Sequence, residues 1–155
     1  PMQRYDLNLF ADYHQFYLQD ELAVGDLSDA WTEEATDRLL ATAPGVVGVG
    51  TIRDMEVPVT VEVLDHEPAQ DSEHFDHVVE CSLAVTSGRI VVAGCTDYFP
   101  EATRIALPAG TYRLRVSYAD LNSLSPDAMD GNDSYRLQLL LAPSIEVSVL
   151  KRRAV

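Results

Sequence analysis

The stretch LPAGTYRLRVSY, residues Leu107–Tyr118, decides the fold. It opens on Pro108-Ala109-Gly110, where proline presets φ and glycine accepts the positive φ of a tight turn. After the turn, apolar or aromatic side chains alternate strictly with polar ones. A period of two predicts a strand with one packed face and one solvated face, as in an antiparallel sheet. The rest of the chain must then supply partner strands and a second layer.

The two faces of this strand differ in kind. Arg113 and Arg115 lie on the solvated face of a chain that is otherwise strongly acidic, and we expect them to pair with acids across the sheet. The packed face, which is expected to lie at the centre of the core, consists of Tyr112, Leu114, Val116 and Tyr118.

Similar short runs recur at regular spacing and predict further strands. Pro58 lies within one of them and favours a sheet edge or a strand start. With one short α-helix near residues 32–42, the pattern predicts a mainly β protein, an antiparallel β-sandwich of about eight to ten strands. The other expected strands cover residues 5–10, 12–20, 46–52, 57–64, 79–85, 89–97, 104–107, 135–141 and 145–150.

The length of 155 residues suits one domain with a sizeable core, which we place at residues 2–150. Pro1 stands before Met2 and is interpreted as the remnant of a cleaved tag. The basic residues 151–155 are expected to form a flexible tail.

The helix prediction rests on its start signals. Thr32 is a suitable N-cap, and Glu33 and Glu34 lie in the first turn, where the helix dipole favours negative charge. A helix of this length depends on packing, for which Trp31 is the obvious anchor. Pro44-Gly45 is expected to end it.

The two cysteines lie in neighbouring expected strands, 79–85 and 89–97, joined at Ser87-Gly88 as a hairpin. A three-residue loop would place Cys81 opposite Cys95, and a two-residue loop would place it opposite Gly94. Nothing indicates an oxidising compartment, so two reduced, packed thiols are expected.

The net charge is −14, from 25 acids and 11 bases. Such a surface repels nucleic acid and anionic membranes and attracts basic partners or cations. Solubility or a salty cytoplasm is an alternative explanation. No apolar run is long enough to span a bilayer and no export signal is visible, so a cytoplasmic protein is expected.

The connection DHEPAQDSEHFDH, residues 65–77, is the best metal candidate. His, Glu and Asp suit zinc or similar ions, and His74 and His77 could converge if the loop folds tightly. The spacing matches no structural zinc pattern, so a solvated polar loop is the simpler interpretation. A metal-dependent enzyme that uses His66, His74 and His77 is kept as an alternative hypothesis for the function.

A second acidic loop, residues 120–134, resembles a calcium loop in composition only, because Gly131 is misplaced for the EF-hand pattern. The glycines at 45, 48 and 50 follow a helix, which is the wrong context for a dinucleotide site. No P-loop or nucleophile motif is present, and no cofactor is predicted. A second hypothesis for the function is a calcium- or ligand-binding β-sandwich module.

Four patches resemble the competence protein J family in the same order along the chain. They are Asp12–Phe16 (DYHQF), Trp31–Ala35 (WTEEA), Gly88–Val92 (GRIVV) and Leu107–Leu114 (LPAGTYRL). The resemblance implies a small, non-catalytic cytosolic protein that inhibits a nuclease of DNA uptake. Longer acidic loops at 65–76 and 120–134 depart from the family pattern, and inhibitor specificity usually resides in such loops.

An acidic inhibitor can occupy the basic cleft with which a nuclease grips DNA, and can be steered there electrostatically. The expected partner is thus a basic protein, a nuclease, without direct contact to nucleic acid or membrane. A homodimer through an exposed edge strand is left open. The predicted partner contacts are Asp65, Glu67, Asp71, Glu73, Asp76, Asp127, Asp130 and Asp133.

Overall fold

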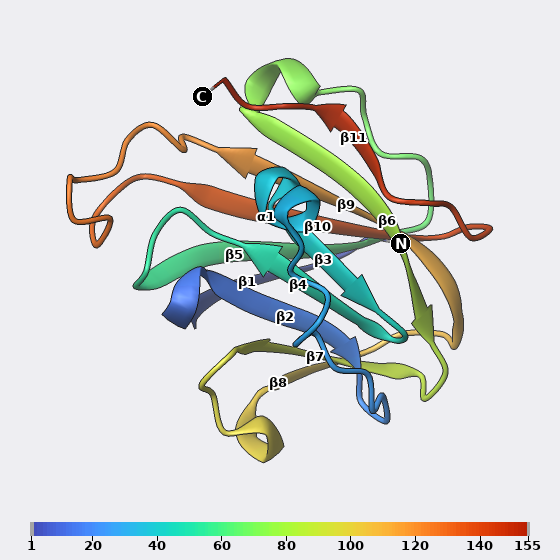
Figure 1. Ribbon diagram of the computed structural model, residues 1–155. Coiled ribbons are helices and arrows are strands. Elements are labelled where there is room, and N and C mark those ends of the chain that lie inside the picture. The colour runs from blue at the N-terminus through green and yellow to red at the C-terminus, as the bar shows by residue number, and fades with distance from the viewer. Residues whose placement is uncertain (1, 155) are drawn as a thin grey trace.

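The computed structural model describes residues 2–154, so Pro1, interpreted as a tag remnant, and Val155 of the tail lie outside the described residues. Within that range two β-sheets pack face to face (Figure 1), which confirms the mainly β, sandwich-like prediction. The first sheet has the order β1 (Gln3–Phe10), β5 (Glu56–Leu64), β10 (Ser134–Leu141), β9 (Gly110–Ala119), β6 (His77–Val85) and β11 (Ser148–Lys151). The second has the order β3 (Leu40–Ala43), β4 (Val46–Gly50), β2 (Gln15–Asp20), β7 (Arg89–Gly94) and β8 (Thr103–Ala106).

Strand β9 lies inside the first sheet, between β10 and β6, and its predicted packed face is confirmed. Tyr112, Leu114, Val116 and Tyr118 are all buried. The Tyr118 ring packs edge-on against Tyr135 of β10, with 5.7 Å between ring centroids. Tyr135 in turn packs edge-on against Phe16 of the second sheet, at 6.0 Å. This aromatic row joins the two layers at the centre of the core.

One strand pair departs from the antiparallel prediction, because β10 runs parallel to β5. Alternation assigns side chains to faces but carries no information on the direction of a neighbouring strand. Pro58 is the third residue of β5, in the sheet interior, so the edge alternative is wrong. Its missing N–H is tolerated because the pairing with β10 begins only at Val59.

The expected hairpin at Ser87-Gly88 is wrong. β6 belongs to the first sheet and β7 to the second, so the connection between them crosses from one layer to the other. The carboxylate of buried Asp20, at the end of β2, holds this crossing through the N–H groups and hydroxyls of Thr86 and Ser87, at 2.8–3.2 Å. A short turn between two alternating strands fits either a hairpin within one sheet or a connection between two sheets. The hydrogen bonds to the buried Asp20 carboxylate stabilise the connection between the sheets.

The separation of β6 from β7 also separates the cysteines. Cys81 lies opposite Leu114 in the core, whereas the Cys95 thiol donates to the Asp12 carbonyl oxygen at 3.5 Å. Both thiols are free, as expected. Burial raises the pKa of the Cys81 thiol to about 12, so it behaves as a packed apolar group.

The α-helix, α1, spans Glu33–Arg38 and is shorter than predicted. Its start is confirmed, because the Thr32 hydroxyl accepts the Ala35 N–H at 3.2 Å. The helix ends at Leu39, which has the left-handed φ of 61°, and β3 follows directly. Pro44-Gly45 instead forms the turn between β3 and β4. Side chains of the first sheet bond the last carbonyls: His77 Nε2 donates to Arg38, and the Tyr118 hydroxyl donates to Leu39.

Gly48 of β4 allows the segment before α1 to pack on the second sheet. A Cβ there would lie 2.7 Å from a Leu27 methyl carbon and 2.9 Å from the Trp31 ring, so only glycine lets the two side chains lie on β4. Trp31 therefore anchors the segment before α1 on the second sheet, as predicted.

The strand predicted over residues 12–20 is interrupted at its start. Asp12–His14 forms the 3-10 turn η1, and β2 begins only at Gln15. Tyr13 and His14 both have positive φ, 57° and 60°, which is uncommon outside glycine. Other 3-10 turns occupy Ser72–His74 (η2) and Phe99–Glu101 (η3).

The described part of the tail is not frayed. Lys151 belongs to β11 and donates to the Ser72 carbonyl oxygen at 3.2 Å. The Arg153 N–H donates to His77 Nδ1 at 3.1 Å. Because His77 Nε2 donates to Arg38, this second bond fixes the buried imidazole as one neutral tautomer. No helix within residues 2–154 combines the length and apolar character that a membrane span requires.

His77 predicts a loss of stability in mild acid. Burial lowers its pKa below 6.5, as do Arg153 and Arg152, although the bond to Arg38 opposes them. The unfolded chain therefore takes up this proton at higher pH than the native chain. The free energy of unfolding should be highest above pH 6.5 and decline as the pH falls below it. Denaturant titrations from pH 7.5 to 5 measure this, and His77→Gln should flatten that decline whereas His74→Gln should not.

Candidate functional site

The acidic loop at residues 65–76 lies over the outer face of the first sheet, on the face of β9 expected to be solvated. Arg115 is buried there, with its Nε 2.9 Å from the Glu80 carboxylate and an Nη1 bond of 3.2 Å to the Ala69 carbonyl oxygen. Arg113 pairs with Glu67 of the loop and lies 3.6 Å from Glu80. The predicted cross-strand pairing is confirmed, but this face is covered rather than wet.

Arg136 of β10 holds the middle of the same loop. Its two terminal nitrogens donate to the two carboxylate oxygens of Asp71 at 2.8 and 2.9 Å, and its guanidinium carbon lies 4.4 Å from the centroid of the Phe75 ring. This fork-to-fork bond lowers the pKa of Asp71, and the bond from Arg113 lowers the pKa of Glu67. Arginines of the sheet therefore hold the loop against its outer face through ion pairs and hydrogen bonds.

The other three acids of this loop differ in their surroundings. Asp76 accepts the Leu121 N–H at 2.8 Å, which ties the loop to the one that follows β9. Asp65 contacts His66 at 2.7 Å, and Glu73 is exposed with His74 at 3.6 Å. Of the predicted contacts in this loop, Asp65, Glu67 and Glu73 face solvent.

The three histidines of the proposed zinc site are held apart. His66 and His74 are exposed beside their own neighbours, whereas His77 is buried between Arg38 and Arg153. Among residues 2–154, no three His, Cys, Asp or Glu side chains are arranged to hold a metal ion. The acids of the calcium-like loop 120–134 form no such group either, within the described residues.

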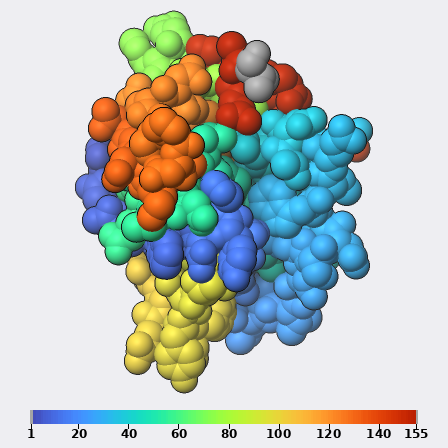
Figure 2. All heavy atoms as spheres, turned by 60° about the vertical axis from the view of Figure 1, so that its left-hand side comes forward, coloured from blue at the N-terminus to red at the C-terminus, as the bar shows by residue number. Residues whose placement is uncertain are grey.

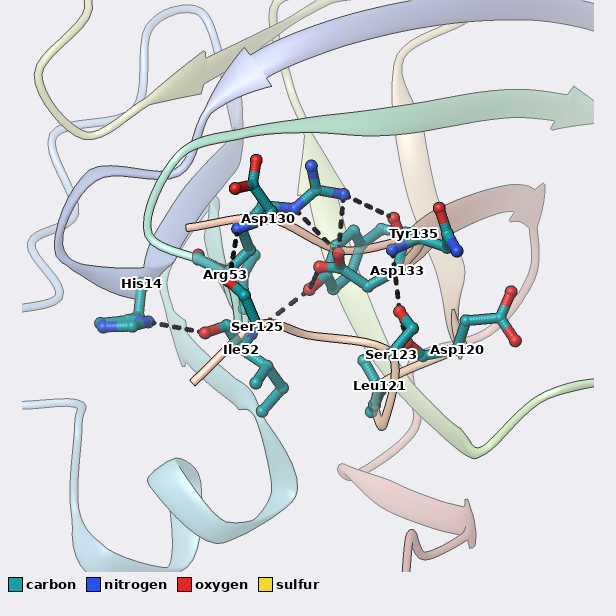
Figure 3. A network of polar contacts seen from close by, with 12 residues as sticks. His14, Ile52, Arg53, Asp120, Leu121, Ser123, Ser125, Asp130, Asp133 and Tyr135 are labelled. Atoms are coloured by element: carbon teal, nitrogen blue, oxygen red, sulfur yellow. Dashed lines mark hydrogen bonds and ion pairs between the residues drawn. The ribbon is translucent and has the colours of Figure 1, made fainter. Parts of the chain in front are cut away.

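The second acidic loop, residues 120–134, is anchored at its end by a buried ion pair (Figure 3). Asp133 is completely buried, and its Oδ1 lies 2.8 Å from Arg53 Nε and 2.7 Å from Arg53 Nη2. Its other oxygen accepts the Tyr135 hydroxyl at 2.6 Å, and that hydroxyl accepts the Ile52 N–H at 3.3 Å. Asp133 therefore lies inside the fold, where it cannot contact a partner directly.

Two serines, Ser123 and Ser125, form hydrogen bonds across the tip of this loop. The Ser125 hydroxyl donates to Asp127 at 2.6 Å and accepts the Asp130 N–H at 3.1 Å, and the first bond lowers the pKa of Asp127. The Ser123 hydroxyl accepts the Asn132 N–H at 2.8 Å. The carboxylates of Asp127 and Asp130 remain exposed at the surface. Of the predicted contacts in this loop, Asp127 and Asp130 are the accessible pair.

The family model described as Competence protein J (ComJ) matches residues 8–142. The chain belongs to the competence protein J family. The ComJ match begins within β1 and contains the η1 turn, every strand from β2 to β10, and both acidic loops. It confirms the family inferred from the four sequence patches. No curated protein matches the chain.

Two solved structures share the ComJ-like fold. One is ComJ from Bacillus subtilis, described as an inhibitor of the DNA degrading activity of NucA, with a TM-score of 0.72 and 19% identity. The other is the protein of crocagin biosynthetic gene J, with a TM-score of 0.62 and 16% identity. In both cases the match covers 92% of this chain and 99% of the other.

Sequence reasoning missed the two anchors of this ComJ-family chain, Asp20 and Asp133. Asp20 was not singled out in the sequence, and Asp133 was counted among the partner contacts. One signal was available: Arg53 is the only Lys or Arg between Arg38 and Arg89, and a lone arginine within an acidic stretch favours an internal ion pair. Its partner, 80 positions away, was not identifiable.

The Arg136–Asp71 bond predicts that Asp71→Ala loosens the 65–76 loop. Arg136 would stay largely buried without its carboxylate, which should cost about 1 to 3 kcal/mol of unfolding free energy. Amide exchange within the loop should accelerate. Glu73→Ala is the matched control, because Glu73 is exposed in the same loop. Unchanged exchange in Asp71→Ala would mean that the arginine does not hold the loop.

Proposed function

We propose that this chain is a non-catalytic inhibitor of a DNA nuclease. The observation that carries the proposal is the ComJ family match over residues 8–142. A member of that family with the same fold across 92% of this chain is described as an inhibitor of the DNA degrading activity of NucA. Neither cofactor nor metal is required, because an inhibitor of this kind acts by occupying its target.

The charge supports a basic partner. The chain carries −14 overall, and several of its arginines are already paired with acids, including Arg53, Arg113, Arg115 and Arg136. A nuclease binds DNA through positive charge, so an acidic protein is attracted to the same surface. Complementary charge of this type accelerates encounter and selects the partner.

The eight predicted acids have two different roles in this proposal. Asp65, Glu67, Glu73, Asp127 and Asp130 are accessible and are proposed to face the nuclease. The more enclosed acids keep the loops in shape for binding; they are Asp71, Asp76 and Asp133. A cytoplasmic location, and a homodimer through an edge strand such as β1, β8 or β11, remain part of the proposal.

The test is a pull-down of purified nucleases with this protein as bait. The nucleases encoded beside its gene are the primary targets, and NucA from Bacillus subtilis is the reference. At least one should be retained at low salt and released progressively as salt rises, because exposed charges are screened. If none is retained, the proposal fails. If retention is indifferent to salt, the electrostatic explanation fails.

A further inference from the structure

An apolar groove lies where the second acidic loop meets the β4–β5 connection. It encloses about 270 Å³ and is lined by Phe10, Arg53, Met55, Glu56, Met129 and Asp130. Three of these are large apolar side chains that stay partly solvent-exposed, at 40% for Phe10, 36% for Met55 and 45% for Met129. Their segments lie together on the face turned toward the viewer in Figure 2. Exposed apolar side chains that share a groove are typical of protein interaction sites.

Backbone bonds join this groove to the η1 turn. The Ala11 N–H donates to the Met55 carbonyl oxygen at 2.9 Å, and the Asp54 N–H donates to the Ala128 carbonyl oxygen at 3.0 Å. His14 binds the Ile52 carbonyl oxygen through Nδ1 at 3.1 Å (Figure 3). The turn, the β4–β5 connection and the loop tip are therefore parts of one surface.

The η1 turn presents an exposed aromatic ring, that of Tyr13, beside the start of the β4–β5 connection. The Tyr13 side chain is 70% exposed. Its backbone has a positive φ, which is unfavourable for a bulky residue. The turn is kept in place because the Thr51 N–H donates to the His14 carbonyl oxygen at 2.8 Å. Tyr13 and His14 also line a second hollow of about 330 Å³ with Trp31. Tyrosine is enriched among the few residues that dominate binding energy at interfaces.

The charge on this surface is negative. Glu56 and Asp130 line the groove, and Asp127 lies at the same loop tip. The one base in the lining, Arg53, is neutralised by Asp133. Asp54 contributes less to this surface, because within the described residues one of its oxygens is buried without a hydrogen bond and the other lies 4.0 Å from His14 Nε2. An apolar centre with unneutralised acids at its rim fits a basic protein surface.

We infer that this surface, made of Phe10, Tyr13, Met55, Met129 and the acids around them, is the docking site for the basic partner. The inference rests on the proposed function. An arginine or lysine of the partner would pack its aliphatic stem on the methionines. Its cationic end would lie near the carboxylates of Glu56 and Asp130, and a second basic side chain of the partner would stack on the exposed Tyr13 ring of the neighbouring hollow by cation–π attraction. The 65–76 loop then supplies long-range attraction, not the centre of contact.

The test compares matched variants as inhibitors of a DNA nuclease that the wild-type protein inhibits. Tyr13→Asn removes the ring but keeps a residue that tolerates positive φ. Met129→Lys places a positive charge in the groove and does not touch the turn. The controls are Tyr98→Asn, since Tyr98 is 69% exposed in the segment before η3, and Glu33→Lys on α1. Thermal unfolding confirms that each variant is folded.

The inference predicts that Tyr13→Asn and Met129→Lys each weaken inhibition at least about ten-fold, as for residues central to an interface, whereas both controls stay within about two-fold of wild type. If Tyr13→Asn and Met129→Lys both inhibit like wild type, or a control loses inhibition instead, this surface is not the docking site and the proposed function stands. If the wild-type protein inhibits none of the nucleases encoded beside its gene, nor NucA, the proposed function and the docking site both fail.

Discussion

Replacing Asp133 with alanine is expected to lower the unfolding free energy by about 3 to 5 kcal/mol, the range for a buried ion pair that loses one partner. Arg53 would be left with 13% of its side chain exposed and no carboxylate. The Tyr135 hydroxyl would also lose its acceptor in the core. Chemical denaturation of the two proteins measures the difference.

The double variant Arg53→Met with Asp133→Ala distinguishes two causes of the lost stability: the missing attraction between the two charges and the cost of leaving Arg53 buried without a partner. The double variant should recover part of the stability, because no buried charge remains without a partner. Asp130→Ala in the same loop is the matched control and should unfold like wild type. A loss under about 1 kcal/mol for Asp133→Ala, or a double variant less stable than the single one, would show that the pair does not anchor the loop.

Asp20→Ala is the second large expected effect, with a loss of about 3 kcal/mol or more, because several charge-assisted hydrogen bonds disappear together. The carboxylate accepts the N–H groups and hydroxyls of Thr86 and Ser87, where the chain crosses between the sheets, and the Leu22 N–H in the turn after β2. Asp20→Asn should lose less, since one oxygen can still accept. Asp26→Ala, at an exposed turn, should have little effect.

The same carboxylate contributes a pH dependence. Burial alone would raise the pKa of Asp20, but the bonds from Ser87, Leu22 and Thr86 outweigh it, so the pKa lies below 3.8. The unfolded chain therefore binds this proton first as the pH falls. The stability that Asp20 contributes is present above about pH 4 and is lost below it. An Asp20→Ala protein as stable as wild type at pH 7 would contradict this role.

Local pattern was enough to predict the frame of this protein. The alternation in β9 and the Thr32 cap both reappear as predicted, because each depends on neighbours within a few residues. The connection of β6 to β7 was mispredicted because its direction depends on Asp20, some 66 positions away. The helix end was likewise set by His77 and Tyr118, which arrive from the other sheet.

The candidate site was predictable only in part. The acidic loops were found, but their acids were treated as equivalent, and pairing with Arg53, Arg113 and Arg136 distinguishes them only after folding. The apolar groove joins residues from three distant segments, 10, 53–56 and 129–130. No periodicity links such positions, so only the fold brings Phe10, Met55 and Met129 together.

The most direct test of the central claim is the initial rate at which a nuclease encoded beside this gene degrades plasmid DNA, measured as this protein is added. The account predicts that the rate falls toward zero near stoichiometric protein at low salt. It also predicts that higher concentrations are needed as salt rises, because complementary charge is screened. A rate unchanged by a large excess of folded protein, across these nucleases and NucA, would contradict the account.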